Sequence, residues 1–348
     1  EIMPSLVGSE MCIRDRLCCA PNGLTALSQR YQHFIRHNIC RSPFRFTRRP
    51  VLINNWEATY FQFNTETICR IAEKAASLGV EMLVLDDGWF GKRDDDNSGL
   101  GDWYVNEKKL PGGLNPLIER VNALGMKFGI WIEPEMISED SDLYRAHHDW
   151  ALTLPGRDPA MGRDQLVLDF GRDEVVDYLT EVLSDLLRNH HIEYVKWDMN
   201  RNMSDVYSRA LPPERQGEVA HRYMLGVYRL LDRLTTAFPN VLFEGCAGGG
   251  GRFDAGMLAY FPQIWCSDDT DAIERLTIQH GTSFGYPVSA MGAHVSACPN
   301  HQTGRSTPLW TRAVVAMSGT FGYELDLGKL SDAECEQVKE QILSLIHI

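Results

Sequence analysis

Acidic and amide side chains follow one apolar segment after another along this sequence. They stand at Asn54-Asn55, Asp86-Asp87, Glu133, Asp169, Asp198 with Asn200, Glu244, and Asp268-Asp269. Helix caps would explain one or two of these residues, because Asp and Asn also begin helices, but not seven segment ends. If the ends meet, their carboxylates must be neutralised by a cation, by fixed Arg or Lys side chains, or by shared protons that separate their pKa values.

Five tryptophans accompany these polar groups and indicate what the site binds. Carboxylates accept hydrogen bonds from sugar hydroxyls, and an indole covers the apolar face of a pyranose ring. A tryptophan on a strand is most often part of the core, but five beside the same segment ends exceed what packing requires. The pattern favours a carbohydrate site that includes Trp56, Trp89, Trp131, Trp197 and Trp265.

The segment 196–200 carries the sharpest chemical pattern. Side chains alternate along a strand, so Lys196, Asp198 and Asn200 would share a face, and a nearby ammonium would keep Asp198 ionised as a nucleophile requires. Asp268 could protonate a leaving oxygen, and the residues alone leave Asp269 open as the acid instead. Carboxyl groups about 5–5.5 Å apart would give a retaining glycosidase and about 6.5–9.5 Å an inverting one; the sequence leaves both open.

The elements that must position these residues alternate between strands and helices. Helices such as 66–78 and 174–190 show apolar spacings of three and four, and Gly79 and Gly125 follow two helices as stops. Strands are predicted at 51–56, 82–85, 127–133, 166–170, 191–198, 241–244, 263–268 and 287–295. This order predicts a fold of the α/β class, a (β/α)8 TIM barrel, whose carboxyl-end rim would collect the polar residues.

Composition excludes several other classes of protein. The 348 residues hold 34 Lys and Arg against 47 Asp and Glu, a net charge of −13, and no basic stripe, so we expect no nucleic-acid partner. No apolar run approaches the roughly 20 residues of a membrane span, so we expect no membrane partner. Nine cysteines without CxxC spacing or a Cys/His cluster predict reduced thiols in a reducing compartment and no metal site. We therefore expect a cytoplasmic location, and export of the parent protein stays open as an alternative.

Both ends carry short segments that we expect not to belong to the natural protein. Residues 11–16 resemble the translation of an adapter used in sequencing libraries, and 343–348 that of its reverse complement. We therefore set aside 1–16 and 343–348 as adapter-like. Residues 17–50 are predicted to connect from a preceding domain, with a helix over 29–36, and 51–342 to form the catalytic barrel of a longer protein.

Five motifs together resemble those of the α-galactosidases of glycoside hydrolase family 36. They are Asn54–Tyr60, Leu85–Gly91, Lys196–Arg201, Glu244–Gly250 and Ser267–Ala272. The resemblance covers about 23–342. It implies a retaining exo-α-galactosidase that hydrolyses terminal α-linked galactose from oligosaccharides such as melibiose and raffinose by double displacement, without a cofactor.

The resemblance also assigns residues. It makes Asp198 the nucleophile and Asp268 the general acid and base, which selects Asp268 over Asp269. The sugar pocket would be completed by Trp56, Asp86, Asp87, Trp131, Arg163, Lys196, Asn200, Cys246 and Gly249.

The chain departs from the family in length, and alternatives stay open. Family members are about twice as long, with an N-terminal β-sandwich and a C-terminal β-domain, and assemble as homo-oligomers, so we expect an oligomeric parent and a weakly active or inactive fragment. An α-galactosyl transglycosidase or an α-N-acetylgalactosaminidase would keep both Asp residues. Outside the class stand a metal-dependent barrel hydrolase, with His294 and His301 as the only histidines near the rim, and a non-catalytic sugar-binding module.

Overall fold

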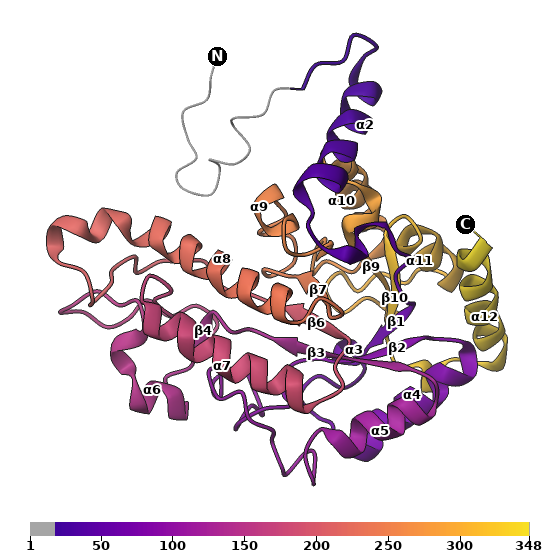
Figure 1. Ribbon diagram of the computed structural model, residues 1–348. Helices are drawn as coiled ribbons and strands as arrows, with labels where there is room; N and C mark the ends of the chain where they lie inside the picture. Colours follow the sequence, from indigo (N-terminus) through magenta and orange to yellow (C-terminus); the bar gives the residue numbers. More distant parts are fainter. Residues whose placement is uncertain (1–17, 348) are drawn as a thin grey trace.

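The computed structural model describes residues 18–347, which fold around a closed barrel of parallel strands (Figure 1). The order around the barrel is β1, β2, β3, β6, β7, β8, β9, β10 and back to β1. The strands span Leu52–Asn54, Met82–Leu85, Lys127–Ile132, Tyr194–Trp197, Leu242–Gly245, Gln263–Trp265, Met291–Ser296 and Thr320–Glu324. The predicted (β/α)8 architecture is confirmed.

Helices surround the barrel and form where the apolar spacing predicts them. In α4 (Thr65–Leu78) the Asn64 side chain accepts from the Thr67 N–H at 2.9 Å, and Gly79 ends the helix at φ 95°. The other long helices are α5 (Asn115–Ala123), α7 (Asp173–Asn189), α8 (Val219–Ala237), α10 (Ala272–Ser283), α11 (Leu309–Ala316) and α12 (Asp332–His347). Short helices are α3 (Trp56–Thr59), α6 (Asp142–Ala146) and α9 (Ala255–Leu258).

The predicted fourth strand is wrong. Leu166–Val167 is β5, which pairs antiparallel with β4 (Met136–Ile137) in a separate two-stranded sheet. Asp169 is therefore not on the rim; it is buried and accepts hydrogen bonds from Ser208 Oγ and the Gly171 N–H. A short apolar run indicates a buried strand without identifying its partner.

The predicted eighth strand is the seventh of the barrel. After a 3₁₀ turn over Val288–Ala290, β9 begins at Met291, and the eighth strand is β10, which the sequence reading missed. The predicted number of eight barrel strands was therefore right only because one wrongly predicted strand, 166–170, offset one missed strand, β10. Glu244 also departs from its expected place, since it lies inside β7, is fully buried and accepts from Gln263 Nε2 at 2.6 Å.

The segment before the barrel packs against it. Helix α2 (Leu24–Phe34) continues into a π-helical turn over Ile35–Ile39, so the helix predicted at 29–36 exists and is longer. The side chains of Ser28 and Gln32 donate to the Ser283 carbonyl of α10, which stands beside α2 in Figure 1. The adapter-like segment 1–16 lies outside the described residues, whereas 343–347 form the end of α12. In the described part, no helix has the length and apolar character of a membrane crossing.

Candidate active site

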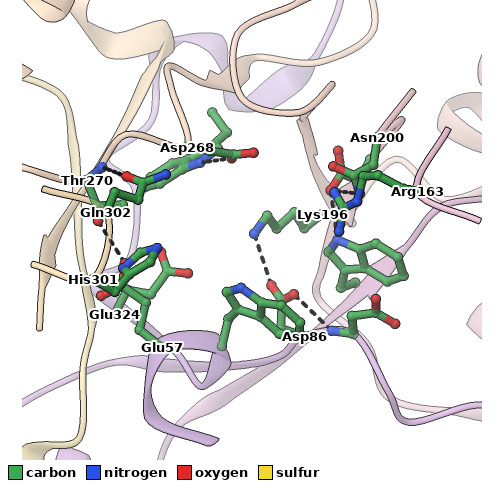
Figure 2. Close-up of a pocket in the computed structure, with 15 residues that line it drawn as sticks. Glu57, Asp86, Arg163, Lys196, Asn200, Asp268, Thr270, His301, Gln302 and Glu324 are labelled. Carbon is green, nitrogen blue, oxygen red and sulfur yellow. Dashed lines mark hydrogen bonds and ion pairs between the residues drawn. The ribbon is translucent and has the colours of Figure 1, made fainter. Parts of the chain in front are cut away.

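The carboxyl ends of the barrel strands enclose a cavity of about 210 Å³ (Figure 2). Nine of the eleven predicted site residues line it: Trp56, Asp86, Asp87, Trp131, Arg163, Lys196, Asp198, Asn200 and Asp268. They come from strands β3 and β6, from the segments that follow β1, β2, β6 and β8, and from the loop before β5. Residues more than 200 positions apart in the chain therefore meet in one bowl, as a parallel barrel requires.

Asp198 directly follows β6, and four donors point at its carboxylate. Trp131 Nε1 lies 3.2 Å and Asn200 Nδ2 2.8 Å from Oδ2. The N–H groups of Met199 and Gly248 lie 2.8 Å and 3.4 Å from Oδ1. Hydrogen bonds to a carboxylate are charge-assisted, and four of them from three segments of the chain hold the group in one orientation.

The carboxyl group of Asp268, in contrast to that of Asp198, has few hydrogen-bond donors. A single donor, Trp265 Nε1, reaches its Oδ1 at 2.9 Å. Its side chain is exposed to the cavity, but protein surrounds the cavity. Desolvation and then the charge of Asp198 raise the pKa of Asp268 to about 6. A carboxyl group with such a pKa can both give and take a proton near neutral pH.

A glycine loop after β7 connects the two carboxyl groups. Gly248 donates to Asp198, and a Cβ on Gly249 would lie 2.7 Å from the backbone nitrogen of Asp268. Burial and then the charge of Asp198 raise the pKa of the Cys246 thiol well above its usual value, so this thiol stays neutral. Neither Cys246 nor Gly249 lines the cavity, and their predicted contact with a sugar stays a prediction.

Lys196 projects to the middle of the cavity (Figure 2). Its Nζ lies 3.0 Å from Asp86 Oδ2, which also accepts from Asn54 Nδ2 at 2.5 Å. Burial alone would lower the pKa of Lys196, but the charges of Asp86 and then Glu324 outweigh it and raise that pKa well above its usual value. The ammonium is thus paired with Asp86, whereas the sequence reading paired it with Asp198.

Asp87 is held by an arginine that the sequence reading missed. Arg93 Nε lies 3.0 Å from Oδ1 and its Nη2 2.9 Å from Oδ2, with both side chains buried. Burial raises the pKa of Asp87, although Arg93 opposes the shift. The bidentate pair fixes the plane of the carboxylate toward the cavity.

Arg163 reaches the cavity from the loop before β5. Its backbone has φ 52°, a left-handed conformation uncommon for a residue with a side chain. The side chain is 43% exposed, and its Nη2 lies 3.3 Å from Asp96 Oδ1 on the loop after β2. Asp96 therefore joins two loops over one edge of the cavity.

Two buried glutamates support the end of β6, next to Asp198, from behind the cavity wall. Glu133 accepts from the Asn200 backbone N–H and from Asn200 Nδ2 at 3.2 Å. Burial and then the charge of Asp198 raise the pKa of Glu133 to about 8. Glu133 thus places Asn200 so that its amide reaches Asp198.

The second glutamate, Glu135, is fully buried and joins three segments. It accepts from Trp197 Nε1 at 2.9 Å, from both terminal nitrogens of Arg252 at 2.9 and 2.7 Å, and from the hydroxyl of Tyr223. Trp197 precedes Asp198, and Arg252 follows the glycine loop. Glu135 therefore ties together two of the three segments that contact the carboxylate of Asp198.

Some residues at the cavity were not foreseen, and some expected ones are absent. Trp265 lines the cavity as expected, but Trp89 and Trp197 are fully buried behind it. The reading did not single out Glu57, Thr270, Gln302 or Glu324, which also line the cavity, and it considered His301 only as a metal ligand. The motifs contained Glu57 and Thr270; Glu324 belongs to the missed strand β10, and no pattern marks Gln302.

The histidines near the rim contact acidic residues. His294 Nδ1 lies 3.0 Å from Glu324 Oε2, and His301 Nδ1 lies 3.5 Å from Glu57 Oε1. Within residues 18–347 no group of three or more His, Cys, Asp or Glu side chains could hold a metal ion. The metal-dependent alternative therefore gains no ligand set from the described residues.

Comparison with known proteins assigns the family. The model of the family Melibiase matches residues 17–347. The chain is 59% identical to α-galactosidase AgaA of Geobacillus stearothermophilus over 92% of its own length, and 60% identical to the bifunctional α-galactosidase/sucrose kinase AgaSK of Mediterraneibacter gnavus over 94%. It spans only 44% and 34% of these two relatives.

Solved structures agree with this assignment. The crystal structure of AgaA, a family 36 glycoside hydrolase, matches with a TM-score of 0.92 and 58% identity, covering 93% of this chain and 45% of that one. Variants of AgaA have been solved in complex with raffinose and with stachyose. The chain therefore belongs to the Melibiase family.

Proposed function

We propose that this chain carries the catalytic barrel of a retaining exo-α-galactosidase, which releases terminal α-linked galactose from oligosaccharides such as melibiose and raffinose. AgaA, bound to raffinose and stachyose in its variants, supports this substrate class. Asp198 is the nucleophile, and Asp268 is the general acid and base.

The reaction takes two displacements. Asp198 attacks the anomeric carbon while the protonated Asp268 gives its proton to the departing oxygen. Asp268 then removes a proton from the water that cleaves the galactosyl ester of Asp198, and the configuration at the anomeric carbon is retained. Asp86, Asp87 and Lys196 bind the galactose hydroxyls from the floor of the cavity.

One observation carries the assignment of roles: the two carboxyl groups of one cavity have opposite surroundings. Four hydrogen-bond donors serve Asp198, whereas Asp268 has one donor and a pKa raised to about 6. A pair of carboxyl groups whose environments separate them in this way divides naturally into an anion and a proton carrier.

Trapping of the covalent intermediate tests the proposal. A fluorinated galactosyl fluoride should label the purified chain on Asp198, as located by peptide mass mapping, and Asp198→Asn should abolish labelling and turnover of an aryl α-galactoside. Asp185→Asn, an exposed position on α7, is the matched control and should behave as the unsubstituted chain. Labelling elsewhere, or turnover by Asp198→Asn, would contradict the mechanism.

Labelling and product analysis together separate two of the remaining alternatives. A sugar-binding module would bind galactose without labelling, and products formed in the presence of sucrose would identify a transglycosidase. Because the chain spans less than half of its relatives, we expect weak turnover, and rates like those of full-length enzymes would refute that expectation. The cytoplasmic location and the oligomeric parent stay predictions.

A further inference from the structure

A polar wall beside Asp268 has no role in the mechanism above. In Figure 2, Glu57, Thr270, His301 and Gln302 lie on the same side of the cavity as Asp268, while Asp86, Arg163 and Asn200 lie across from them. His301 and Gln302 are exposed at the mouth of the cavity, in the loop after β9. This wall therefore borders both the acid and the solvent.

The wall is held in place from below. The carboxyl group of Glu57, whose side chain is 2% exposed, accepts from Thr270 Oγ1 at 2.8 Å and from the Ala297 N–H at 2.9 Å. Gln302 Oε1 accepts from the Thr270 N–H at 3.3 Å. Three loops are joined in this way, so the wall is fixed relative to Asp268, two residues before Thr270.

Hydrogen-bonding capacity is left over at the mouth. Neither Gln302 Nε2 nor His301 Nε2 has a hydrogen-bond partner in the part of the chain that the structure describes. The other ring nitrogen, His301 Nδ1, makes one long contact of 3.5 Å with Glu57 Oε1. Such groups face water in the free protein and can exchange it for ligand hydroxyls.

The position of Asp268 places the leaving group here. In the proposed function, Asp86 and Lys196 bind galactose at the floor of the cavity, and Asp268 gives its proton to the departing oxygen. The group that carries this oxygen must then lie beside Asp268, on the side of the cavity where His301 and Gln302 are exposed.

We propose that His301 and Gln302 form a leaving-group subsite that favours galactosides whose leaving group is itself a sugar. The proposal rests on the proposed function and adds a substrate preference to it. Glu57 is a positioning residue for this subsite, because it acts through Thr270 and His301.

The test compares a sugar leaving group with an aromatic one. kcat/KM is measured for melibiose and for 4-nitrophenyl α-galactoside with the unsubstituted chain, with the double variant His301→Ala/Gln302→Ala, and with the control His221→Ala, an exposed histidine on α8. Loss of two hydrogen bonds should lower kcat/KM for melibiose about tenfold more than for the aryl substrate. The control should leave the ratio unchanged.

A binding measurement makes the test independent of turnover. In the Asp198→Asn background, calorimetry should show that the double variant lowers the affinity for raffinose about tenfold toward that for galactose. An equal loss for both substrates, or no loss, would overturn the subsite while leaving the proposed function intact. If the unsubstituted chain neither hydrolyses these substrates nor binds galactose, the proposed function fails, and the subsite fails with it.

Discussion

Replacing Gly249 with Ala tests how closely the glycine loop sets the position of Asp268, the proposed acid. The added Cβ would lie 2.7 Å from the Asp268 nitrogen and 3.0 Å from Ser267 Cα. Both contacts are with backbone, which no side-chain rotation can relieve. Because ordinary contact begins near 3.4 Å, the segment that carries Asp268 must move by about 0.7 Å relative to the loop.

The backbone strain of this substitution can be measured separately. Gly249 has φ +86°, where an alanine costs about 1–2 kcal/mol. Gly113 has the same φ of +86° with no atom within 4 Å of its added Cβ. Gly113→Ala therefore carries the same strain without the clash, and the difference between the two variants isolates the displacement of Asp268.

We expect Gly249→Ala to lower kcat/KM for melibiose about 10- to 100-fold below Gly113→Ala, because misplacement by about 1 Å can cost about a hundredfold in rate. The assay is steady-state hydrolysis, together with the rate of covalent labelling. Thermal unfolding of both variants checks that the fold survives. Activity of Gly249→Ala within threefold of its control would refute the close approach of this loop to the acid.

Four further outcomes are expected. kcat/KM for melibiose should fall as pH rises through about 6, because Asp268 loses its proton there, and Asp268→Asn should remove this limb with an activated aryl substrate; a flat wild-type profile would contradict the role. Chelators should leave turnover unchanged, since the described residues contain no ligand cluster, and loss of activity restored by a metal would favour the metal-dependent alternative. Asp96→Asn should raise KM about two- to fivefold at unchanged kcat, because the partly exposed pair with Arg163 is weak; a large fall in kcat would argue against this. Glu135→Gln should lower the free energy of unfolding in denaturant by about 3 kcal/mol by leaving Arg252 buried without its ion-pair partner, and full stability would refute the support that we assign to it.

The barrel was predictable from the alternation of apolar runs and helices, but the identity of two strands was not. Leu166–Val167 is as apolar as a barrel strand, yet it pairs with β4 in a separate two-stranded antiparallel sheet. Strand β10 reads Thr-Phe-Gly-Tyr-Glu, with a glycine at its centre. A Cβ at Gly322 would lie 2.7 Å from His294 Cδ2, so the position has no room for a side chain. The apolar pattern of a short segment indicates that the segment is buried. Which strand it pairs with depends on tertiary packing, which one sequence does not show.

The site was predictable where its residues follow strands and belong to motifs. Asp86, Asp198 and Asp268 do both, and the cavity brings all three together. Glu135 was not predictable, because its buried ion pair with Arg252 joins distant segments and leaves no local spacing. Arg93 lies only six residues after Asp87, but no pattern in the loop between them marks it as the partner of that carboxylate. Arg163 lies between these cases, because the family resemblance assigned it to the site, whereas the strand that follows it, β5, was wrongly placed in the barrel.

Burial and then the repulsion between carboxylates explain why two carboxyl groups of the cavity have raised pKa values. The acidic groups that line the cavity outnumber the basic ones, with Glu57, Asp86, Asp87, Asp198, Asp268 and Glu324 against Lys196 and Arg163. Burial would raise the pKa of Glu324, but His294 and then Lys196 outweigh it and lower that pKa. Among the described residues, no such partner outweighs burial at Asp268, whose pKa rises to about 6, or at Glu57, whose pKa rises to about 8. In the proposed reaction, the raised pKa of Asp268 would supply the proton for the leaving group, and the remaining carboxylates would stabilise the positive charge that develops on a sugar ring in an oxocarbenium-like transition state.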